Sequence, residues 1–224
     1  MVDSSTAEIL HNGMLKYILC RTASDDKPAF SAGQEYWSPL SGFPGFCGQA
    51  GGWAIHDQDL AVILGMWEDS ESIDRFMAEL HDQCFDHSGQ RNLIREIEVT
   101  AWSRVIEADA GFAGIAEAET QGGVLRIADC MLLDGMHRRE HFIRMQSEIW
   151  NPAMQDSGVL GSSTWSAVNN PKRFLITSLW KSEEHLRSWL DGKFHQAWTE
   201  ADVEDDCEAV SGKLVNLEYS WRVN

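Results

Sequence analysis

Two stretches decide the fold of this chain: GMWEDSESIDRFMAELH at residues 65–81 and SLWKSEEHLRSWLDGKFHQAW at residues 178–198. Each places a tryptophan at the end of an apolar run, continues with serine and acidic residues that can cap a helix, and then shows apolar side chains at helical spacing. Trp180 follows Trp67 by 113 residues (180 minus 67). A pattern that recurs at this distance indicates an internal duplication.

The other tryptophans also recur when the second half is slid onto the first. The predicted pairs are Trp37 with Trp150, Trp53 with Trp165 at a shift that differs by one residue, and Trp102 with Trp221, while Trp189 and Trp198 stand opposite Phe76 and Phe85. The duplication divides the chain into a first half at 13–106, a linker at 107–122 that is small and acidic, and a second half at 123–224.

Each half is predicted to run strand, helix, strand, strand, helix, strand. The first strand covers 14–22, the first helix of the second half covers 136–154, and the last strand covers 212–223. This order gives a four-stranded antiparallel sheet with two helices on one face. The other face also carries apolar side chains, so the two sheets can cover each other. The predicted fold class is α+β, with two fused ferredoxin-like βαββαβ units that pack sheet to sheet.

The composition excludes several classes of function. The formal charge of −17 disfavours binding to nucleic acid or to anionic membranes, because such a surface repels phosphate groups. We see no signal peptide at the N-terminus and no apolar run long enough to span a membrane. The five cysteines form no CxxC pair, which argues against a disulfide framework or a zinc site and favours the cytoplasm.

With these motifs the sequence resembles the dimeric α+β barrel superfamily, which includes the antibiotic-biosynthesis monooxygenases and the haem-degrading monooxygenases. The two opening stretches resemble the second-helix signature of that superfamily. The first half is also similar to an uncharacterised family of single-domain bacterial barrel proteins, through the residues AFSAGQEYW, GFCGQAGGW and FMAELHDQCF. Members usually form dimers sheet to sheet, so a tandem copy implies that barrel within one chain. A homodimer of whole chains stays open.

The resemblance also raises haem as a cofactor. In the haem-degrading relatives a tryptophan on the second helix presses on the porphyrin, and a histidine about ten residues later ligates the iron. Trp189 matches the tryptophan, and Phe76 stands there in the first half. Ten residues further on are Thr199 and Asp86, neither of which matches the histidine. The strand-one asparagine of those relatives is missing as well. The expected cofactor is therefore none, with haem as the alternative.

His81 and His195 are the candidate catalytic bases. His81 follows Met77 by four residues and precedes Phe85 by four, at the border of the apolar stripe. There it can act as a general base beside a pocket or as a hydrogen-bonded residue at the edge of the core. His195 is its approximate counterpart, although the strict register sets Phe194 against His81. No metal site is expected, because His81 and His87 point about 120° apart on a helix.

Large aromatic side chains on amphipathic elements either form core or line a pocket for a small molecule. The candidate substrate-binding residues are Trp37, Trp53, Trp67, Phe76, Trp150, Trp165, Trp180 and Trp189. The resemblance implies an enzyme of the antibiotic-biosynthesis monooxygenase type that oxidises a small aromatic or phenolic compound without metal or flavin. The alternative is a non-enzymatic protein that binds a small hydrophobic or aromatic molecule.

Overall fold

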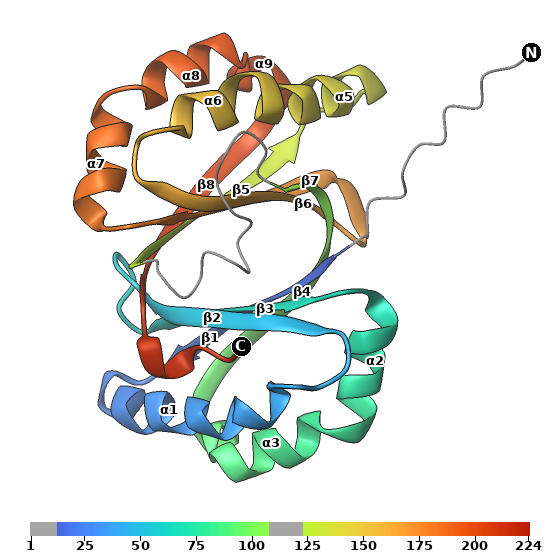
Figure 1. Ribbon diagram of the computed structural model, residues 1–224, viewed down its shortest axis with the longest axis vertical. Helices are drawn as coiled ribbons and strands as arrows, with labels where there is room; N and C mark the ends of the chain where they lie inside the picture. The colour runs from blue at the N-terminus through green and yellow to red at the C-terminus, as the bar shows by residue number, and fades with distance from the viewer. Residues whose placement is uncertain (1–12, 108–122) are drawn as a thin grey trace, which may run out of the picture.

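The structure, a computed structural model, describes residues 13–107 and 123–224, and these residues form eight strands. Those of the first half are β1 (Met14–Thr22), β2 (Phe46–Ala54), β3 (Leu60–Trp67) and β4 (Ile94–Glu107). Those of the second half are β5 (Val124–Leu132), β6 (Val159–Ala167), β7 (Asn170–Trp180) and β8 (Cys207–Leu217). They close into one antiparallel barrel in the order β1-β3-β2-β8-β5-β7-β6-β4 (Figure 1).

Two seams join the halves. Strand β4 pairs with β6 from Trp102 opposite Ala167 to Glu107 opposite Ser163. Strand β2 pairs with β8 through three residue pairs, the first of which is Gly52 with Leu217. A Cβ atom on Gly52 would lie 1.8 Å from the backbone oxygen of Asn216, so this seam requires glycine. The barrel predicted to form within one chain is therefore confirmed, and its closure depends on contacts between the two halves.

The barrel interior is an apolar core to which both halves contribute. Leu15 and Trp102 of the first half pack there with Leu125, Trp165 and Leu175 of the second. All five side chains are buried. Because burial of apolar side chains is the main stabilising term in folding, this shared core holds the two sheets against each other.

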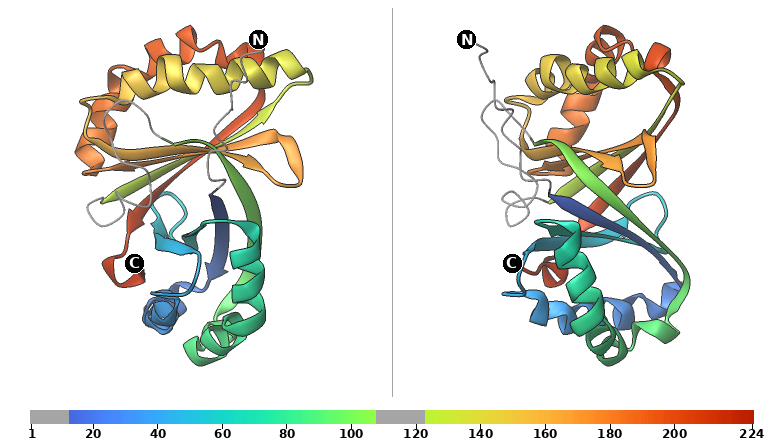
Figure 2. Two further views of the ribbon diagram at one scale, coloured as in Figure 1. Left: turned by 45° about the vertical axis from the view of Figure 1, so that its right-hand side comes forward. Right: turned by 90° about the vertical axis from the view of Figure 1, so that its right-hand side faces the viewer.

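Helices cover the outer faces of the two sheets, so the molecule has a helical layer on each side of the barrel (Figure 2). The first half carries α1 (Lys27–Gly33), a 3₁₀ helix (Gln34–Leu40), α2 (Ser70–Glu79), α3 (His81–Ser88) and 3₁₀ turns at Ser24–Asp26 and Gln90–Asn92. The second half carries α5 (Met136–Met145), a π-helical turn (Gln146–Trp150), α6 (Asn151–Met154), α7 (Glu183–Asp191), α8 (Phe194–Glu200) and α9 (Val203–Asp206). Met136 to Met154 is thus continuous helix, as predicted.

The second helix of each half is broken, whereas the sequence predicted one helix in each place. Asp69 and Ser182 cap the first segments by accepting a hydrogen bond from the backbone N–H of Ser72 and His185. In the first half the break falls at Leu80, which has φ −130° and ψ −30°. In the second it falls after Asp191, at Gly192. The break makes His81 the first residue of α3 rather than a residue in the middle of a helix.

Trp53 and Trp165 are not equivalent, which corrects the predicted pairing. In the ladder with β3, Trp53 lies opposite Ala61 and Gly52 lies opposite Val62. In the matching ladder with β7, the residue that corresponds to Gly52 is Trp165. A shift of one residue moves a strand side chain to the other face of the sheet. Trp53 therefore packs on the helical side against Phe30, whereas Trp165 lies inside the barrel.

The pairing of Trp102 with Trp221 is also wrong. Trp102 lies opposite Leu15 in the β1 ladder, and the matching residue of the second half is Val215, which lies opposite Leu125. The last strand ends at Leu217 rather than continuing to 223, and Trp221 follows it in a 3₁₀ turn at Tyr219–Trp221. From there the C-terminal residues cross to the first half (Figure 1), where Trp221 packs against Phe30 and Trp53.

The predicted linker, apart from Glu107, lies outside the described residues. In the part of the chain that the structure describes, no helix has the length and apolar character needed to cross a lipid bilayer.

Candidate functional site

A cavity of about 420 Å³ lies in the first half, between the outer face of the sheet and the helices. All four strands of that half contribute to its lining, together with α1, α2, α3 and the 3₁₀ helix Gln34–Leu40. Small-molecule sites are usually cavities of roughly 300–1,000 Å³ with mainly apolar walls and a few polar groups. The size and position of this cavity fit that description.

Aromatic rings form the helical wall of the cavity. The Trp37 ring lies 6.4 Å from that of Phe76 and 6.3 Å from that of Phe85, measured between centroids. Phe76 in turn lies 5.0 Å from Trp67, at the end of β3. The rings are tilted or edge-on, an arrangement that stabilises such clusters. The helical wall of the cavity is therefore aromatic.

His81 stands in the middle of this aromatic wall. Its ring centroid lies 5.8 Å from that of Trp37, 5.6 Å from that of Phe76 and 5.7 Å from that of Phe85. Its Nδ1 atom lies 2.9 Å from Asp82 Oδ1, and only 22% of its side chain is exposed. Because an ionised carboxylate only accepts hydrogen bonds, Nδ1 carries the hydrogen in this contact, and in the neutral form of the imidazole Nε2 has the lone pair.

Lys16 is the cation of the cavity. It lies on β1 beside Gly65 of β3, and its Nζ atom lies 5.4 Å above the centroid of Phe76 and 3.0 Å from the sulfur of Met77. Its ammonium forms no ion pair with any described carboxylate. Burial lowers the pKa of Lys16 from its ordinary value, because removal from water disfavours the charged form. An anionic ligand would supply the missing counter-charge.

Three buried glutamines line the cavity. Gln90 accepts a hydrogen bond from Trp37 Nε1 at 3.0 Å and donates one to the Phe30 carbonyl at 2.8 Å. Gln49 donates to the carbonyl of Trp221 at 3.0 Å and to Gln34 Oε1 at 3.4 Å. The C-terminal residues of the second half therefore help to shape the cavity of the first.

Cys20 also faces the cavity, and burial raises the pKa of its thiol to about 12. A thiol with this pKa stays protonated near neutral pH, so Cys20 does not supply a thiolate nucleophile. It acts as a small apolar wall residue.

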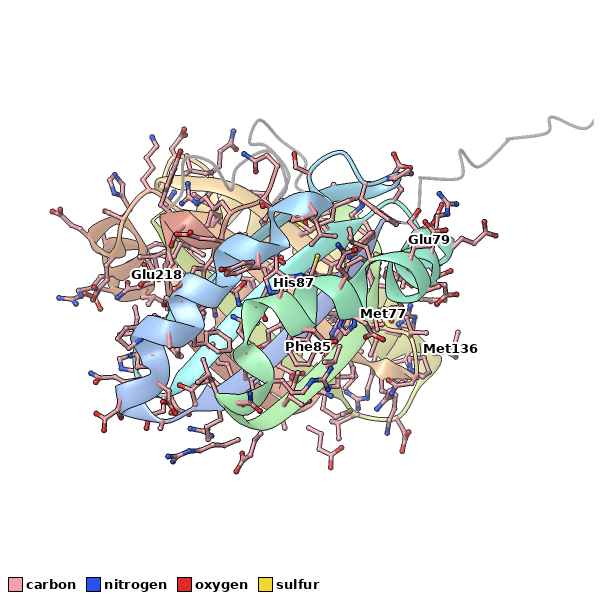
Figure 3. All side chains as sticks on the ribbon, turned by 90° about the horizontal axis from the view of Figure 1, so that it is seen from below. Met77, Glu79, Phe85, His87, Met136 and Glu218 are labelled. Atoms are coloured by element: carbon pink, nitrogen blue, oxygen red, sulfur yellow. The ribbon has the colours of Figure 1, made fainter. Side chains whose placement is uncertain are left out.

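Exposed apolar side chains mark the rim of the cavity. Ile97 is 55% exposed, Val99 48% and Met77 41%, and all three line the cavity. Figure 3 looks onto the helices of the first half, where Met77 and Phe85 lie along α2 and α3. Exposed apolar groups of this kind commonly surround the entrance of a ligand site.

The corresponding cavity of the second half is almost filled, with a volume of about 40 Å³. Trp189 and Trp198 replace the smaller Phe76 and Phe85, and both line what remains. Phe194 takes the place of His81, since its ring lies 5.6 Å from Trp150 and 5.2 Å from Trp189. The two halves therefore share a scaffold but differ in free space and in the polar group at its wall.

The structure brings some of the predicted site residues together and separates others. Trp37, Trp67, Phe76 and His81 line the open cavity, and Trp150 and Trp189 line the small one, with Trp180 packed 5.2 Å from Trp189. Trp53 and Trp165 line neither cavity. His195 is exposed on α8 and borders neither of them.

Sequence reasoning missed Lys16 and the three glutamines. One signal was available for the lysine, because Arg126 stands at the matching place in β5. Lys16 lies beside Gly65, and Arg126 lies beside the corresponding Ser178. A cation at the same place in two mainly apolar strands marks a position that the two halves share. No comparable pattern marks the glutamines, which converge only through tertiary contacts.

Possible metal ligands do not converge among the described residues of either half. No group of three or more histidine, cysteine, aspartate or glutamate side chains within 13–107 and 123–224 could hold a metal ion. Asp86 is exposed and accepts a hydrogen bond from Arg91 at 2.8 Å. Thr199 donates to the carbonyl of His195 at 3.1 Å. The residues at the iron-ligand position of the haem-degrading relatives therefore do not fit that role.

Each half of the chain matches a known family model. Residues 14–102 match the model of a domain of unknown function (DUF4937), and residues 138–201 match that of antibiotic biosynthesis monooxygenase. The uncharacterized protein YdbC of Bacillus subtilis (strain 168) is 35% identical over 91 residues, which are 40% of this chain and 76% of that protein.

Solved structures extend the similarity to the whole barrel. A proposed monooxygenase of Lactobacillus acidophilus NCFM superposes with a TM-score of 0.72 at 12% identity, covering 95% of this chain and 96% of that one. An anthrone oxidase-like protein gives a TM-score of 0.67 at 8% identity, covering 94% and 92%. At these identities the likeness concerns the fold. The chain belongs to the family of YdbC through its first half, and carries an antibiotic biosynthesis monooxygenase domain in its second half on an α+β barrel of that type.

Proposed function

We propose that the first-half cavity is the active site of a monooxygenase-type enzyme that oxidises a small aromatic compound with an acidic hydroxyl or C–H group. The observation that carries the proposal is His81, the imidazole in an aromatic wall whose counterpart in the filled second half is Phe194. The antibiotic biosynthesis monooxygenase match and the monooxygenase-like structural neighbours support the same class of reaction.

The chemistry that follows from this geometry needs a base, a dry cavity and oxygen. His81 Nε2 removes a proton from the substrate, and the electron pair of that bond stays on the substrate as a phenolate or enolate. The carbanion form adds to oxygen, and the proton held by His81 completes a hydroperoxide. Loss of water then breaks the O–O bond and leaves a carbonyl group. For an anthrone the balance is anthrone plus O₂ to anthraquinone plus water.

Each wall of the cavity has a part in this scheme. The rings of Trp37, Phe76 and Phe85 hold a flat substrate and exclude water from the anion. Asp82 fixes the orientation of the imidazole through its contact with Nδ1. The positive charge of Lys16 stabilises the anion as it forms, an effect that is strong in a water-poor site.

The test is oxygen uptake with 1,8-dihydroxyanthrone, because one structural neighbour is named as anthrone oxidase-like. We expect saturable oxygen consumption and quinone formation by the full chain, above the rate in buffer that contains free imidazole. His81→Phe, which copies the second half, should lose this activity, whereas the exposed His87→Phe should keep it. Binding of the anthrone without oxygen uptake would favour a non-enzymatic binding protein instead.

A further inference from the structure

Arg126 is the unexplained charge of the second half. It lies on β5, and its side chain lines the small cavity of about 40 Å³. Its guanidinium forms no hydrogen bond and no ion pair with any described residue. Its partners in the two neighbouring ladders are Ser178 of β7 and Leu214 of β8, neither of which is acidic. The part of the chain that the structure describes therefore supplies no counter-charge for this cation.

Two aromatic rings flank the guanidinium. Its Cζ atom lies 5.5 Å from the ring centroid of Trp189 and 5.4 Å from that of Phe194. Such contacts stabilise a cation through the faces of the rings, but they offer no oxygen to the five N–H donors of an arginine. Burial lowers the pKa of Arg126, although an arginine keeps its charge near neutral pH. Charged donors that are removed from water and left unpaired are costly, so an acceptor from solution would stabilise this group.

The rest of the cavity lining contains no acidic residue. The other lining residues of the described chain are apolar or aromatic, apart from Gln146 and Cys130. Gln146 donates a hydrogen bond to the carbonyl of Phe142 at 3.4 Å. Trp189 also lines the cavity, and its buried Nε1 atom has no hydrogen-bond partner among the described residues. The cavity thus combines a fixed positive charge with polar N–H groups and no negative charge.

The volume limits what can enter. A cavity holds one water molecule when it offers roughly 10–15 Å³, so about 40 Å³ accommodates about three groups of that size. Formate consists of one carbon and two oxygens, and its oxygens match the paired N–H groups of a guanidinium. A flat aromatic molecule of the kind proposed for the first half is too large for this space.

We propose that the second half binds a small carboxylate anion, of the size of formate or acetate, in a bidentate contact with the guanidinium of Arg126. The anion supplies the missing counter-charge and stabilises the fold of that half. Lys16, at the matching place in the first half, presents a single ammonium without the planar fork that holds two oxygens. The inference does not rest on the proposed function, because the first-half cavity takes no part in it.

The test is thermal unfolding of the full chain in sodium formate, in a buffer without chloride. Sodium gluconate at equal ionic strength is the reference, because gluconate is too large for the cavity. We expect the unfolding temperature to rise with the logarithm of the formate concentration, by about 3–6 °C for each tenfold increase above the dissociation constant. The ¹³C line width of labelled formate measures binding independently and should broaden in a saturable manner.

Three variants assign the response to one half. Arg126→Met should abolish both effects of formate, and in gluconate it should be at least as stable as the unmodified chain, because an unpaired buried charge is removed. Arg187→Met is the matched control, since its guanidinium is exposed and bonds to Glu183 at 2.6 Å, and it should keep both effects. Lys16→Met should keep them as well.

Arg126→Lys tests the fork itself, because it keeps the positive charge. The dissociation constant for formate should rise about tenfold in this variant, and an unchanged constant would contradict the bidentate contact. Equal formate effects in Arg126→Met and the unmodified chain, or no difference between formate and gluconate, would overturn the anion site. Loss of the effects in Lys16→Met alone would place the anion in the first half and would overturn it too.

Discussion

His81 and Phe194 occupy matching positions in the two halves. The ring of His81 packs against Trp37 and Phe76, and the ring of Phe194 packs against Trp150 and Trp189. The Trp37–His81 centroid distance is 5.8 Å, and the Trp150–Phe194 distance is 5.6 Å. One half therefore holds an imidazole with an open cavity beside it, and the other holds a phenyl ring in a nearly filled one. This difference in free space and in the polar group is why we propose the first-half cavity as the site.

Replacing His81 with phenylalanine should separate catalysis from binding. We expect the rate of anthrone oxidation to fall by about 10²- to 10⁴-fold, which is the usual contribution of a general base. Binding of 2-hydroxy-1,4-naphthoquinone, a flat aromatic anion, should change much less, because Lys16 and the aromatic rings of the cavity wall remain in place. His195→Phe tests the other candidate from the sequence and should retain activity, since His195 borders neither cavity. Equal rates for His81→Phe and the unmodified chain would remove His81 as the base.

Filling the open cavity should weaken ligand binding without lowering the stability of the fold. The double variant Phe76→Trp with Phe85→Trp copies Trp189 and Trp198, which leave the second cavity only about 40 Å³. We expect affinity for the naphthoquinone to fall at least tenfold, about 1.4 kcal/mol, and the unfolding temperature to stay the same or rise. Unchanged affinity in a folded double variant would place the ligand elsewhere.

Lys16 should give ligand binding a pH dependence. Burial lowers its pKa below the ordinary 10.5, so its charge is lost at a lower pH than that of an exposed lysine. An anion that does not itself titrate in this range should bind best below the lowered pKa and progressively less well as the pH rises through it. Lys16→Arg keeps the charge and should remove this decline. Affinity that is flat up to pH 10.5 in the unmodified chain would show that Lys16 does not contact the anion.

Gly52→Ala should destabilise the seam between β2 and β8. The new Cβ would lie 1.8 Å from the backbone oxygen of Asn216, so the strands must separate or shift. Such overpacking costs roughly 1–3 kcal/mol, measured as the free energy of unfolding in urea. Gly212→Ala on β8 is the matched control, because its Cβ would stand 3.6 Å from the nearest atom, the Ile127 oxygen. Similar stability of the two variants would contradict the tight approach at the seam.

Haemin should not bind in the manner of the haem-degrading relatives. Asp86 is engaged with Arg91 and Thr199 with the backbone, so the position of the iron ligand offers no imidazole in either half. An absorbance titration of the full chain should show no saturable Soret band. A band that saturates at one haem per chain, and that His81→Phe removes, would instead make His81 an iron ligand.

The repeated tryptophan-and-helix pattern was sufficient to predict two α+β units whose sheets cover each other, because the periodicity of strands and helices is local. That the two sheets close into one barrel followed from the family resemblance. The candidate site was harder to predict from the sequence. Trp53 and Trp165 look like a pair in the sequence, yet a register difference of one residue puts them on opposite faces of their sheets. Trp221 resembles a strand residue, but it crosses to the other half. Register and chain crossing depend on tertiary contacts, which one sequence does not reveal.

His81 and the aromatic wall could be proposed from helical spacing, whereas the volume beside them could not. Whether a cavity stays open depends on Phe76 and Phe85 being smaller than Trp189 and Trp198, and on the break at Leu80 that sets His81 at the start of α3. These features combine residues from several elements.

The most direct measurement is a crystal structure of the full chain with bound 2-hydroxy-1,4-naphthoquinone. The account predicts one molecule in the first-half cavity, with its ionised oxygen facing the ammonium of Lys16 and its rings against the wall that contains His81. A ligand in the second half, in the barrel interior, or in the first-half cavity with its oxygen turned away from Lys16 would contradict it.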